Sequence, residues 1–513
     1  MEYRNPVLTG FYPDPSICRA GNDYYMVTSS FEYLPGIPVF HSRDLVNWEQ
    51  VGHCLTRKEQ MTFPEAPASG GIYASTIRYH QGKFYVTSTN TSAQGHTGNF
   101  IVSAEDPAGE WSDPVWVEQG GIDPSLFFDK DGTAYYTSNG MFRDHSGVMR
   151  NMIQQSVISA ETGEILRGPE VISLGTGGRC AEGPHLYRKD GMYYLLLAEG
   201  GTELGHMETI FRSENPFGPF QPCPGNPILT ARDENRPELA AAGHADIVED
   251  ADGRYWMVFL CYRTIDAKFH HLGRETSIVP LIWEEGTWPQ IPGGRAPRRL
   301  VRCLPEREVA QRDLRRSFYD DFSGTRKLDW NTIREYCGEI ETGKEGLRIK
   351  GSRISLWEQK TPSFLGVRQK HMRFLCSTDL RFMPETPEEE AGLCVLYSNT
   401  AYYSFRIVRG KKGFALSLRR RIHDMETEQR CLELKEGRAE IAVMGEEADY
   451  HFGVMENGEF LELAKADTRL LSTEVNRGFT GVYIGLYASG NGKNCRKPAV
   501  FSYFRYEGQD DEV

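Results

Sequence analysis

The chain has 513 residues, which is long for one compact core and predicts two domains. Its 52 glycines and 12% aromatic content favour an all-β protein. A formal net charge of −13 at pH 7 argues against a nucleic-acid partner, which would require a basic face, but it places no limit on a neutral partner such as a sugar.

The sequence also bears on membranes and on the cellular compartment. No stretch approaches the roughly 18 apolar residues of a membrane span, so we expect no membrane partner. Residues 1–6 lack the apolar run of a signal sequence. The 11 cysteines are scattered without a Cys-x-x-Cys pair, as is typical of buried, reduced thiols. These features together predict a cytoplasmic protein.

A repeated unit runs through the first part of the chain. In each copy a glycine opens a tyrosine-rich strand pattern, and successive copies are spaced by about 50 to 60 residues. These glycines are Gly21, Gly82, Gly132, Gly191 and Gly253. A second series with similar spacing comprises Ser42, Ser103, Ser159, Ser213 and, less clearly, Ser277. Five such copies predict a five-bladed β-propeller, with a β-sandwich of accidental similarities as the alternative.

A highly charged stretch ends this repeat. Residues 296–317 lack the blade pattern, and strand-like segments without the repeat follow them. We therefore expect a propeller over 1–295, a linker over 296–317 and a β-sandwich over 318–513. The second domain has no obvious catalytic cluster, and its expected role is to stabilise, to bind sugar or to shape the rim of the pocket.

Three acidic residues lie at related places in the repeat: Asp14, Asp123 and Glu182, each about seven to nine residues before an opening glycine. They should begin innermost strands and converge on the propeller axis, together with the segments 74–75 and 243–246. Each motif alone is also a typical turn signature. Carboxylates that converge in a desolvated funnel raise the pKa of at least one of them, which gives the protonated and ionised pair that glycoside hydrolysis needs.

The segments 11–16, 121–125 and 181–185 resemble the signature segments of glycoside hydrolase family 43, and most closely its intracellular β-xylosidases and α-L-arabinofuranosidases. The resemblance is dense from residue 3 to about 290 and looser beyond. It implies a five-bladed propeller followed by a β-sandwich. It also implies an exo-acting, inverting enzyme that releases terminal β-D-xylose, α-L-arabinofuranose or both from small oligosaccharides.

The resemblance assigns roles to the three acids. Asp14 is the expected general base that deprotonates the attacking water, and Glu182 is the expected general acid that protonates the leaving oxygen. Asp123 is expected to orient Glu182, to keep its pKa raised and to bind a sugar hydroxyl. Inversion requires room for water, so the carboxyl groups of Asp14 and Glu182 should lie about 6.5–9.5 Å apart.

Five further residues are assigned from matching motifs. Arg274 is expected to contact substrate hydroxyls and a catalytic carboxylate, with a surface ion pair as the alternative. Phe31 and Thr202 are expected to line the sugar pocket, although Phe31 also suits a blade core. Tyr73 replaces the tryptophan of many family members, which leaves the choice between xyloside and arabinofuranoside open. His244 is expected to hold a calcium ion on the axis, largely through waters, or else to be a hydrogen-bonded core histidine; the reaction itself requires no cofactor.

The sequence favours exo action over endo action. An apparent insertion between Glu32 and Ile72, and a second-domain loop with Phe479, are expected to close one side of the funnel. An endo-acting arabinanase with an open groove is one alternative. A non-catalytic sugar-binding propeller is another, against which the intact acidic trio argues. We also expect a homo-oligomer by analogy with the family.

Overall fold

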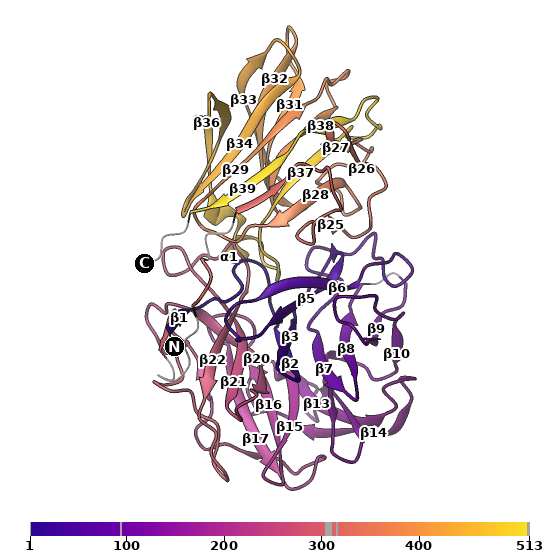
Figure 1. The fold of residues 1–513 in the computed structure, drawn as a ribbon, viewed down its shortest axis with the longest axis vertical. Helices are drawn as coiled ribbons and strands as arrows, with labels where there is room; N and C mark the ends of the chain where they lie inside the picture. The colour runs from indigo at the N-terminus through magenta and orange to yellow at the C-terminus, as the bar shows by residue number, and fades with distance from the viewer. Residues whose placement is uncertain (1, 93–94, 303–309, 314–316, 510–513) are drawn as a thin grey trace.

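A computed structural model describes residues 2–92, 95–302, 310–313 and 317–509, and nearly all of its regular structure is β-strand. Figure 1 shows two stacked domains, with the N-terminal part of the chain below and the C-terminal part above. The predicted all-β class, a propeller followed by a sandwich, is confirmed. No helix in the described ranges has the length and apolar character needed to cross a membrane.

Five sheets of consecutive strands form the lower domain. The first contains β2 (Ser16–Ala20), β3 (Asp23–Val27), β5 (Gly36–Ser42) and β6 (Glu49–Leu55). The second contains β7 (Thr76–His80), β8 (Lys83–Asn90), β9 (Gly98–Ala104) and β10 (Val115–Val117). The third contains β11 (Ile122–Phe128), β12 (Ala134–Arg143), β13 (Met149–Ile158) and β14 (Ile165–Ser173). The fourth contains β15 (Glu182–Lys189), β16 (Met192–Glu199), β17 (Met207–Ser213), β18 (Gln221–Pro222) and β19 (Leu229–Thr230), and the fifth contains β20 (Ala240–Glu249), β21 (Tyr255–Tyr262) and β22 (Glu275–Leu281).

The repeat glycines explain how each blade begins. All five lie in the turn between the first and second strands of a blade and have positive φ, from +64° at Gly21 to +87° at Gly132. Glycine adopts this conformation without steric cost, which is why the tight turns keep it. The serine series marks the end of the third strand in four blades, but Ser277 lies inside β22.

The N-terminal segment closes the ring. Strand β1 (Glu2–Arg4) pairs with β23 (Leu300–Arg302), and Leu8 bridges Thr276 of the fifth blade. Strand β23 falls within the predicted linker, whose residues 303–309 and 314–316 lie outside the described residues. The expected insertion after Glu32 is wrong for residues 36–55, because these form β5 and β6 of the first blade.

The upper domain consists of two antiparallel sheets packed face to face. One contains β24 (Ser317–Asp320), β26 (Ile340–Gly343), β27 (Gly346–Ile349), β29 (Phe374–Arg381), β34 (Arg438–Glu446), β35 (Asp449–Glu456), β36 (Glu459–Asp467), β38 (Ala499–Phe501) and β39 (Phe504–Gly508). The other contains β28 (Ser363–Arg368), β30 (Glu390–Ser398), β31 (Ala401–Arg409), β32 (Phe414–Ile422), β33 (Met425–Leu434) and β37 (Tyr483–Ser489). Side chains such as Phe374, Phe405 and Phe452 fill the core between the sheets.

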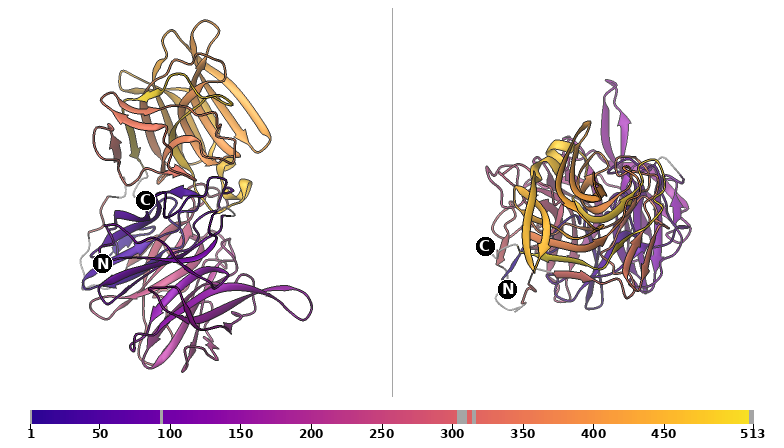
Figure 2. Two further views of the ribbon diagram at one scale, coloured as in Figure 1. Left: turned by 90° about the vertical axis from the view of Figure 1, so that its right-hand side faces the viewer. Right: turned by 90° about the horizontal axis from the view of Figure 1, so that it is seen from above.

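The two domains are joined by backbone pairing and by an aromatic cluster. Strand β4 (Tyr33–Leu34) of the propeller pairs with β25 (Thr332–Ile333), beside which Tyr33 stacks on Tyr483 with ring centroids 3.9 Å apart. The segment that contains η1 (Thr468–Leu471) and α1 (Thr473–Asn476) descends from the sandwich onto the propeller. Both views in Figure 2 show the sandwich seated on one face of the ring. That face is where the innermost strands begin, so the second domain borders the cavity described next.

Candidate active site

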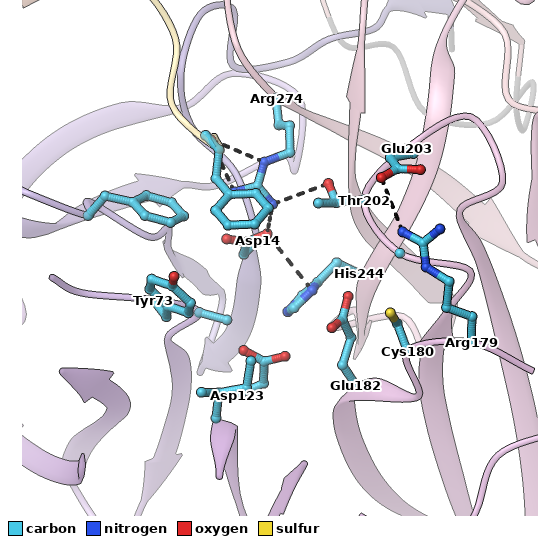
Figure 3. Close-up of a pocket in the computed structure, with 15 residues that line it drawn as sticks. Asp14, Tyr73, Asp123, Arg179, Cys180, Glu182, Thr202, Glu203, His244 and Arg274 are labelled. Carbon is cyan, nitrogen blue, oxygen red and sulfur yellow. Dashed lines mark hydrogen bonds and ion pairs between the residues drawn. The ribbon is translucent and has the colours of Figure 1, made fainter. Parts of the chain in front are cut away.

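One cavity of about 230 Å³ brings together every residue that the sequence singled out. Its lining includes Asp14, Phe31, Tyr73, Asp123, Glu182, Thr202, His244 and Arg274. Figure 3 shows the carboxyl groups of Asp14, Asp123 and Glu182 facing a shared space, with Arg274 above them and Tyr73 to one side. The three acids come from different blades, as the repeat predicts.

A β-bulge at the start of the innermost strands points these side chains at the axis. In the third, fourth and fifth blades two residues oppose one on the neighbouring strand, for example between Ile122 and Ser125. In these three blades a bulge residue has a left-handed backbone, with φ near +50° at Asp123, Gly183 and His244, and Asp14, just before β2 of the first blade, has the same conformation. Glu182 therefore stands one position before the equivalents of the two aspartates, and the bulge redirects it toward them.

Asp14 is held as an ionised group. Its carboxylate accepts hydrogen bonds from Arg274 Nη1 at 2.6 Å and from Ser29 Oγ at 2.5 Å, and His244 Nδ1 lies 3.8 Å away. Burial alone would raise the pKa of Asp14, but the guanidinium, the imidazole and the hydroxyl outweigh it and leave that pKa below its ordinary value. A carboxylate that stays ionised is suited to accept a proton from water.

Glu182 is held as a protonated group. Burial raises its pKa to about 8, and the negative charges of Asp123 and Asp14 add to the effect. Burial also raises the pKa of Asp123, which accepts a hydrogen bond from the Gly183 N–H at 3.2 Å. That contact ties Asp123 to the residue next to Glu182. The cavity thus contains one acid that carries a proton at neutral pH and one that does not.

Arg274 is buried at the site, with only 5% of its surface exposed, so the alternative of a surface ion pair is wrong. Besides Asp14, its guanidinium donates to Thr202 Oγ1 at 3.5 Å and to the Phe479 carbonyl oxygen at 3.3 Å. Figure 3 shows Thr202 and Asp14 on the same side of the guanidinium. The arginine therefore connects the base, a pocket hydroxyl and the second domain.

An aromatic wall bounds the cavity opposite Glu182. Phe31, Tyr73 and Phe479 form a triangle of contacting rings, with the centroid of Phe31 5.2 Å from that of Tyr73 and 6.2 Å from that of Phe479. Phe31 lines the cavity as expected, but with 2% of its surface exposed it packs into the cluster between the domains and not into a blade core. Flat apolar rings of this kind suit the apolar face of a sugar.

Direct calcium ligation does not fit the residues around His244. Calcium takes about six to eight oxygen ligands, whereas among the described residues the one carboxylate within 4 Å of a His244 ring nitrogen is that of Asp14. Within the described residues no group of three or more His, Cys, Asp or Glu side chains is placed to hold a metal. A calcium ion held largely through waters stays a prediction, and the hydrolytic reaction does not require it.

A buried ion pair lies one layer below the catalytic cavity. Arg78 Nη1 contacts Asp246 Oδ2 at 2.7 Å, and the same carboxylate accepts hydrogen bonds from Ser16 and Tyr187. Arg78 also donates to His185 Nδ1 at 3.0 Å, because burial lowers the pKa of His185 to about 3 and leaves it neutral. This network joins the innermost strands of four blades beneath the site.

Sequence reasoning missed several residues that line or support the cavity. Arg179, Cys180 and Glu203 lie on the Glu182 side, and Arg179 pairs with Glu203 at 3.1 Å. In the sequence, only their closeness to Glu182 and Thr202 indicated that they line the cavity. Ser29, which donates a hydrogen bond to Asp14, lies just after β3 of the first blade and was not predicted. Phe479 was named only as part of a closing loop.

Comparisons with known proteins agree with this architecture along the whole chain. The family model of glycosyl hydrolases family 43 matches residues 3–289, and the β-xylosidase C-terminal concanavalin A-like domain matches residues 319–507. The chain is 39% identical over 515 residues to a non-reducing end α-L-arabinofuranosidase from Bacteroides ovatus, covering 99% of this chain and 95% of that protein. It is 37% identical to a xylosidase/arabinosidase from Butyrivibrio fibrisolvens, over 98% of this chain and 99% of that protein.

Solved structures give the same result. The Bacteroides ovatus xyloglucan-locus GH43B structure superposes with a TM-score of 0.91 at 37% identity, covering 99% of this chain and all of that one. A xylan β-1,4-xylosidase from Bacillus halodurans superposes with a TM-score of 0.89 at 32% identity, over 98% of this chain and 100% of that chain. On the evidence of its motifs, fold and relatives, this chain belongs to glycosyl hydrolases family 43.

Proposed function

We propose that this protein is an exo-acting, inverting glycoside hydrolase that releases terminal β-D-xylose, α-L-arabinofuranose or both from short oligosaccharides. The observation that carries the proposal is the opposite protonation of two acids in one cavity. Asp14 has a lowered pKa and Glu182 a pKa raised to about 8. A protonated donor beside an ionised acceptor is what hydrolysis by inversion needs.

The reaction follows from these two states. Asp14 accepts a proton from a water molecule as the water oxygen bonds to the anomeric carbon. Glu182 gives its proton to the glycosidic oxygen as the bond from that oxygen to the anomeric carbon breaks. Exchange of protons with solvent then restores both residues. Asp123 holds the backbone at Gly183 and keeps Glu182 protonated through its charge.

Exo action follows from the size and walls of the cavity. A volume of about 230 Å³ lies below the range of about 300–1,000 Å³ for drug-sized ligands and suits one terminal sugar better than a polymer. Phe479 of the second domain closes one side. The full-length relatives named above are a non-reducing end arabinofuranosidase and a xylosidase/arabinosidase, which supports removal of terminal pentoses.

A panel of nitrophenyl glycosides tests the proposal. We expect hydrolysis of the β-D-xylopyranoside, the α-L-arabinofuranoside or both, with a product of inverted anomeric configuration in proton NMR spectra recorded during turnover. Asp14→Asn, which removes the base whatever the leaving group, is the matched inactive control. Activity on polymeric arabinan without activity on the nitrophenyl glycosides would instead indicate endo action, and sugar binding without hydrolysis would indicate a lectin.

Three expectations accompany this function as predictions. A cytoplasmic location is consistent with the ten free cysteines of the described residues. A homo-oligomer is expected, and light scattering of the purified protein would measure its mass. Loss of activity in a chelator, restored by calcium, would support an axial ion, and unchanged activity would argue against it.

A further inference from the structure

The peptide of Phe479 is held at both of its polar groups. Its carbonyl oxygen accepts hydrogen bonds from Arg274 Nη2 at 3.3 Å and Nε at 3.4 Å. Its N–H donates to Ser69 Oγ at 2.8 Å. Ser69 belongs to the loop before the second blade, whereas Arg274 precedes the last strand of the fifth. A second-domain peptide therefore bridges two distant parts of the propeller.

Ser69 is itself fixed by a buried carboxyl group. Its N–H donates to Glu32 Oε2 at 3.0 Å, and Glu32 is 2% exposed. Ser69 is also buried and has a left-handed backbone, with φ of +62°. Any side chain at Gly478, the residue before Phe479, would meet Ser69 Oγ, since a Cβ there would lie 2.7 Å from it. These contacts leave the hydroxyl of Ser69 little freedom.

The other side of the same segment is fixed to the fifth blade. Val482 N–H donates to the His271 carbonyl at 2.9 Å, and Gly481 approaches Gly273 so closely that a Cβ on either would clash with the other's backbone. Arg274 follows directly after Gly273. The segment around Phe479 is thus confined between Ser69 and the loop that carries Arg274.

We propose that Ser69 and Glu32 are positioning residues that clamp the Phe479 peptide, so that its carbonyl holds Arg274 against Asp14. The chain of contacts runs from Glu32 through Ser69, Phe479 and Arg274 to the carboxylate. It makes the geometry of the base depend on docking of the second domain. This inference rests on the proposed function, because it assigns the clamp to the base of that reaction.

Loss of the clamp should change the pH dependence of the reaction, which a loss of folding stability alone would not do. Arg274 is the strongest of the groups that lower the pKa of Asp14, so a loosened Arg274 raises that pKa. The charged or titratable groups that face Asp14 are Arg274, His244, His206, Asp123 and Glu182. The clamp touches only Arg274 among them. Because the base acts when ionised, losing the clamp moves the acidic limb of the rate profile to higher pH.

Two variants remove the hydroxyl of Ser69. Ser69→Gly suits the left-handed backbone, and Ser69→Ala keeps the Cβ, so agreement between them excludes local strain as the cause. We expect kcat/KM on a nitrophenyl pentoside to fall about tenfold, and its acidic limb to move up by about half a pH unit or more. Glu32→Ala should act in the same direction, whereas Glu32→Gln, which keeps an oxygen acceptor for Ser69, should restore most of the wild-type profile.

Gln359→Ala is the matched control. Gln359 donates to the Glu65 carbonyl at 2.8 Å, so it joins the second domain to the same loop without reaching the cavity. This variant should keep the wild-type acidic limb. An unchanged limb in both Ser69 variants, even with lowered thermal stability, would overturn the clamp. A wild-type protein that hydrolyses no pentoside would overturn the proposed function instead.

Discussion

A proton remains on Glu182 near neutral pH because burial, and then the negative charges of Asp123 and Asp14, raise its pKa, whereas Asp14 has an arginine at 2.6 Å. In the fourth blade the left-handed position is occupied by Gly183, and its acid stands one place earlier. A Cβ at Gly183 would lie 3.2 Å from the His244 ring, so glycine also makes room at the axis.

The charge of Asp123 should be measurable through Glu182. In Asp123→Asn the neighbouring negative charge is gone, so the pKa of Glu182 falls and its proton is lost at lower pH. We expect the alkaline limb of kcat/KM to move toward neutrality, with a lower maximum because a sugar contact is altered. The amide oxygen of asparagine can still accept the Gly183 N–H, which preserves the backbone. An alkaline limb at the wild-type position would contradict the electrostatic role of Asp123.

Much of this site could be predicted at the level of residues. The three acids follow the spacing of the blades, Arg274 and Thr202 match motifs of the family, and all five line the cavity. The one-residue offset of Glu182 was not predictable, because it depends on a bulge that has no sequence signature of its own. Ser29 and Cys180 were missed for a similar reason, since their roles depend on side-chain direction.

At the scale of elements, the innermost strands are joined by a buried charge pair. Asp246 has no exposed side-chain surface, and Arg78 is its ion-pair partner. Burial raises the pKa of Asp246, but Arg78 and His185 outweigh it and lower that pKa. Because these side chains come from separate blades, the pair fixes how the strands meet below the catalytic cavity.

Removing Arg78 should destabilise the propeller more than removing a surface arginine. Arg78→Ala leaves the Asp246 carboxylate buried without its counter-charge, which we expect to lower the free energy of unfolding by about 3 kcal/mol. Arg150→Ala, which breaks an exposed pair with Asp144, should cost less than about 0.5 kcal/mol. Urea denaturation followed by tryptophan fluorescence measures both, and equal losses in the two variants would refute the structural role of the axial pair.

The number of blades could be predicted from the repeated turns, but the strands β5 and β6 could not be predicted. The five glycines gave the blade count because each turn needs a positive φ. The predicted insertion between Glu32 and Ile72 is wrong for residues 36–55, which form β5 and β6, although Ser42 within this stretch belongs to the second repeated series. Those strands are determined by tertiary packing, which a repeated local sequence pattern does not show.

Over the whole molecule, the active site is completed by a residue from the second domain. Phe479 contacts Ser69, which is 410 residues earlier in the chain, and its ring lies beside Phe31. The sequence predicted that a second-domain loop with Phe479 closes one side of the funnel, but the contacts of its peptide with Ser69 and Arg274 have no local sequence pattern. The second domain is therefore a structural part of the catalytic cavity.

Phe479→Ala tests this contribution. Removing the ring opens one wall of the cavity while leaving the backbone carbonyl that holds Arg274. We expect KM for a terminal pentoside to rise by about 5- to 30-fold, with a smaller change in kcat, because the loss of one apolar contact is worth about 1–2 kcal/mol. Tyr319→Ala, an exposed second-domain position away from the cavity, is the control. An unchanged KM would place the sugar elsewhere.

The proposed mechanism requires that Glu182 is protonated at neutral pH and that Asp14 is ionised. Its most direct test is the pH dependence of kcat/KM for a pentoside with a poor leaving group, in the wild type and in Glu182→Gln. The wild type should lose activity on the alkaline side with an apparent pKa of about 8, and the variant should lose that limb together with about 10²–10⁴-fold of its rate. A wild-type rate that stays constant through this pH range, or a variant that keeps the same limb, would contradict the account.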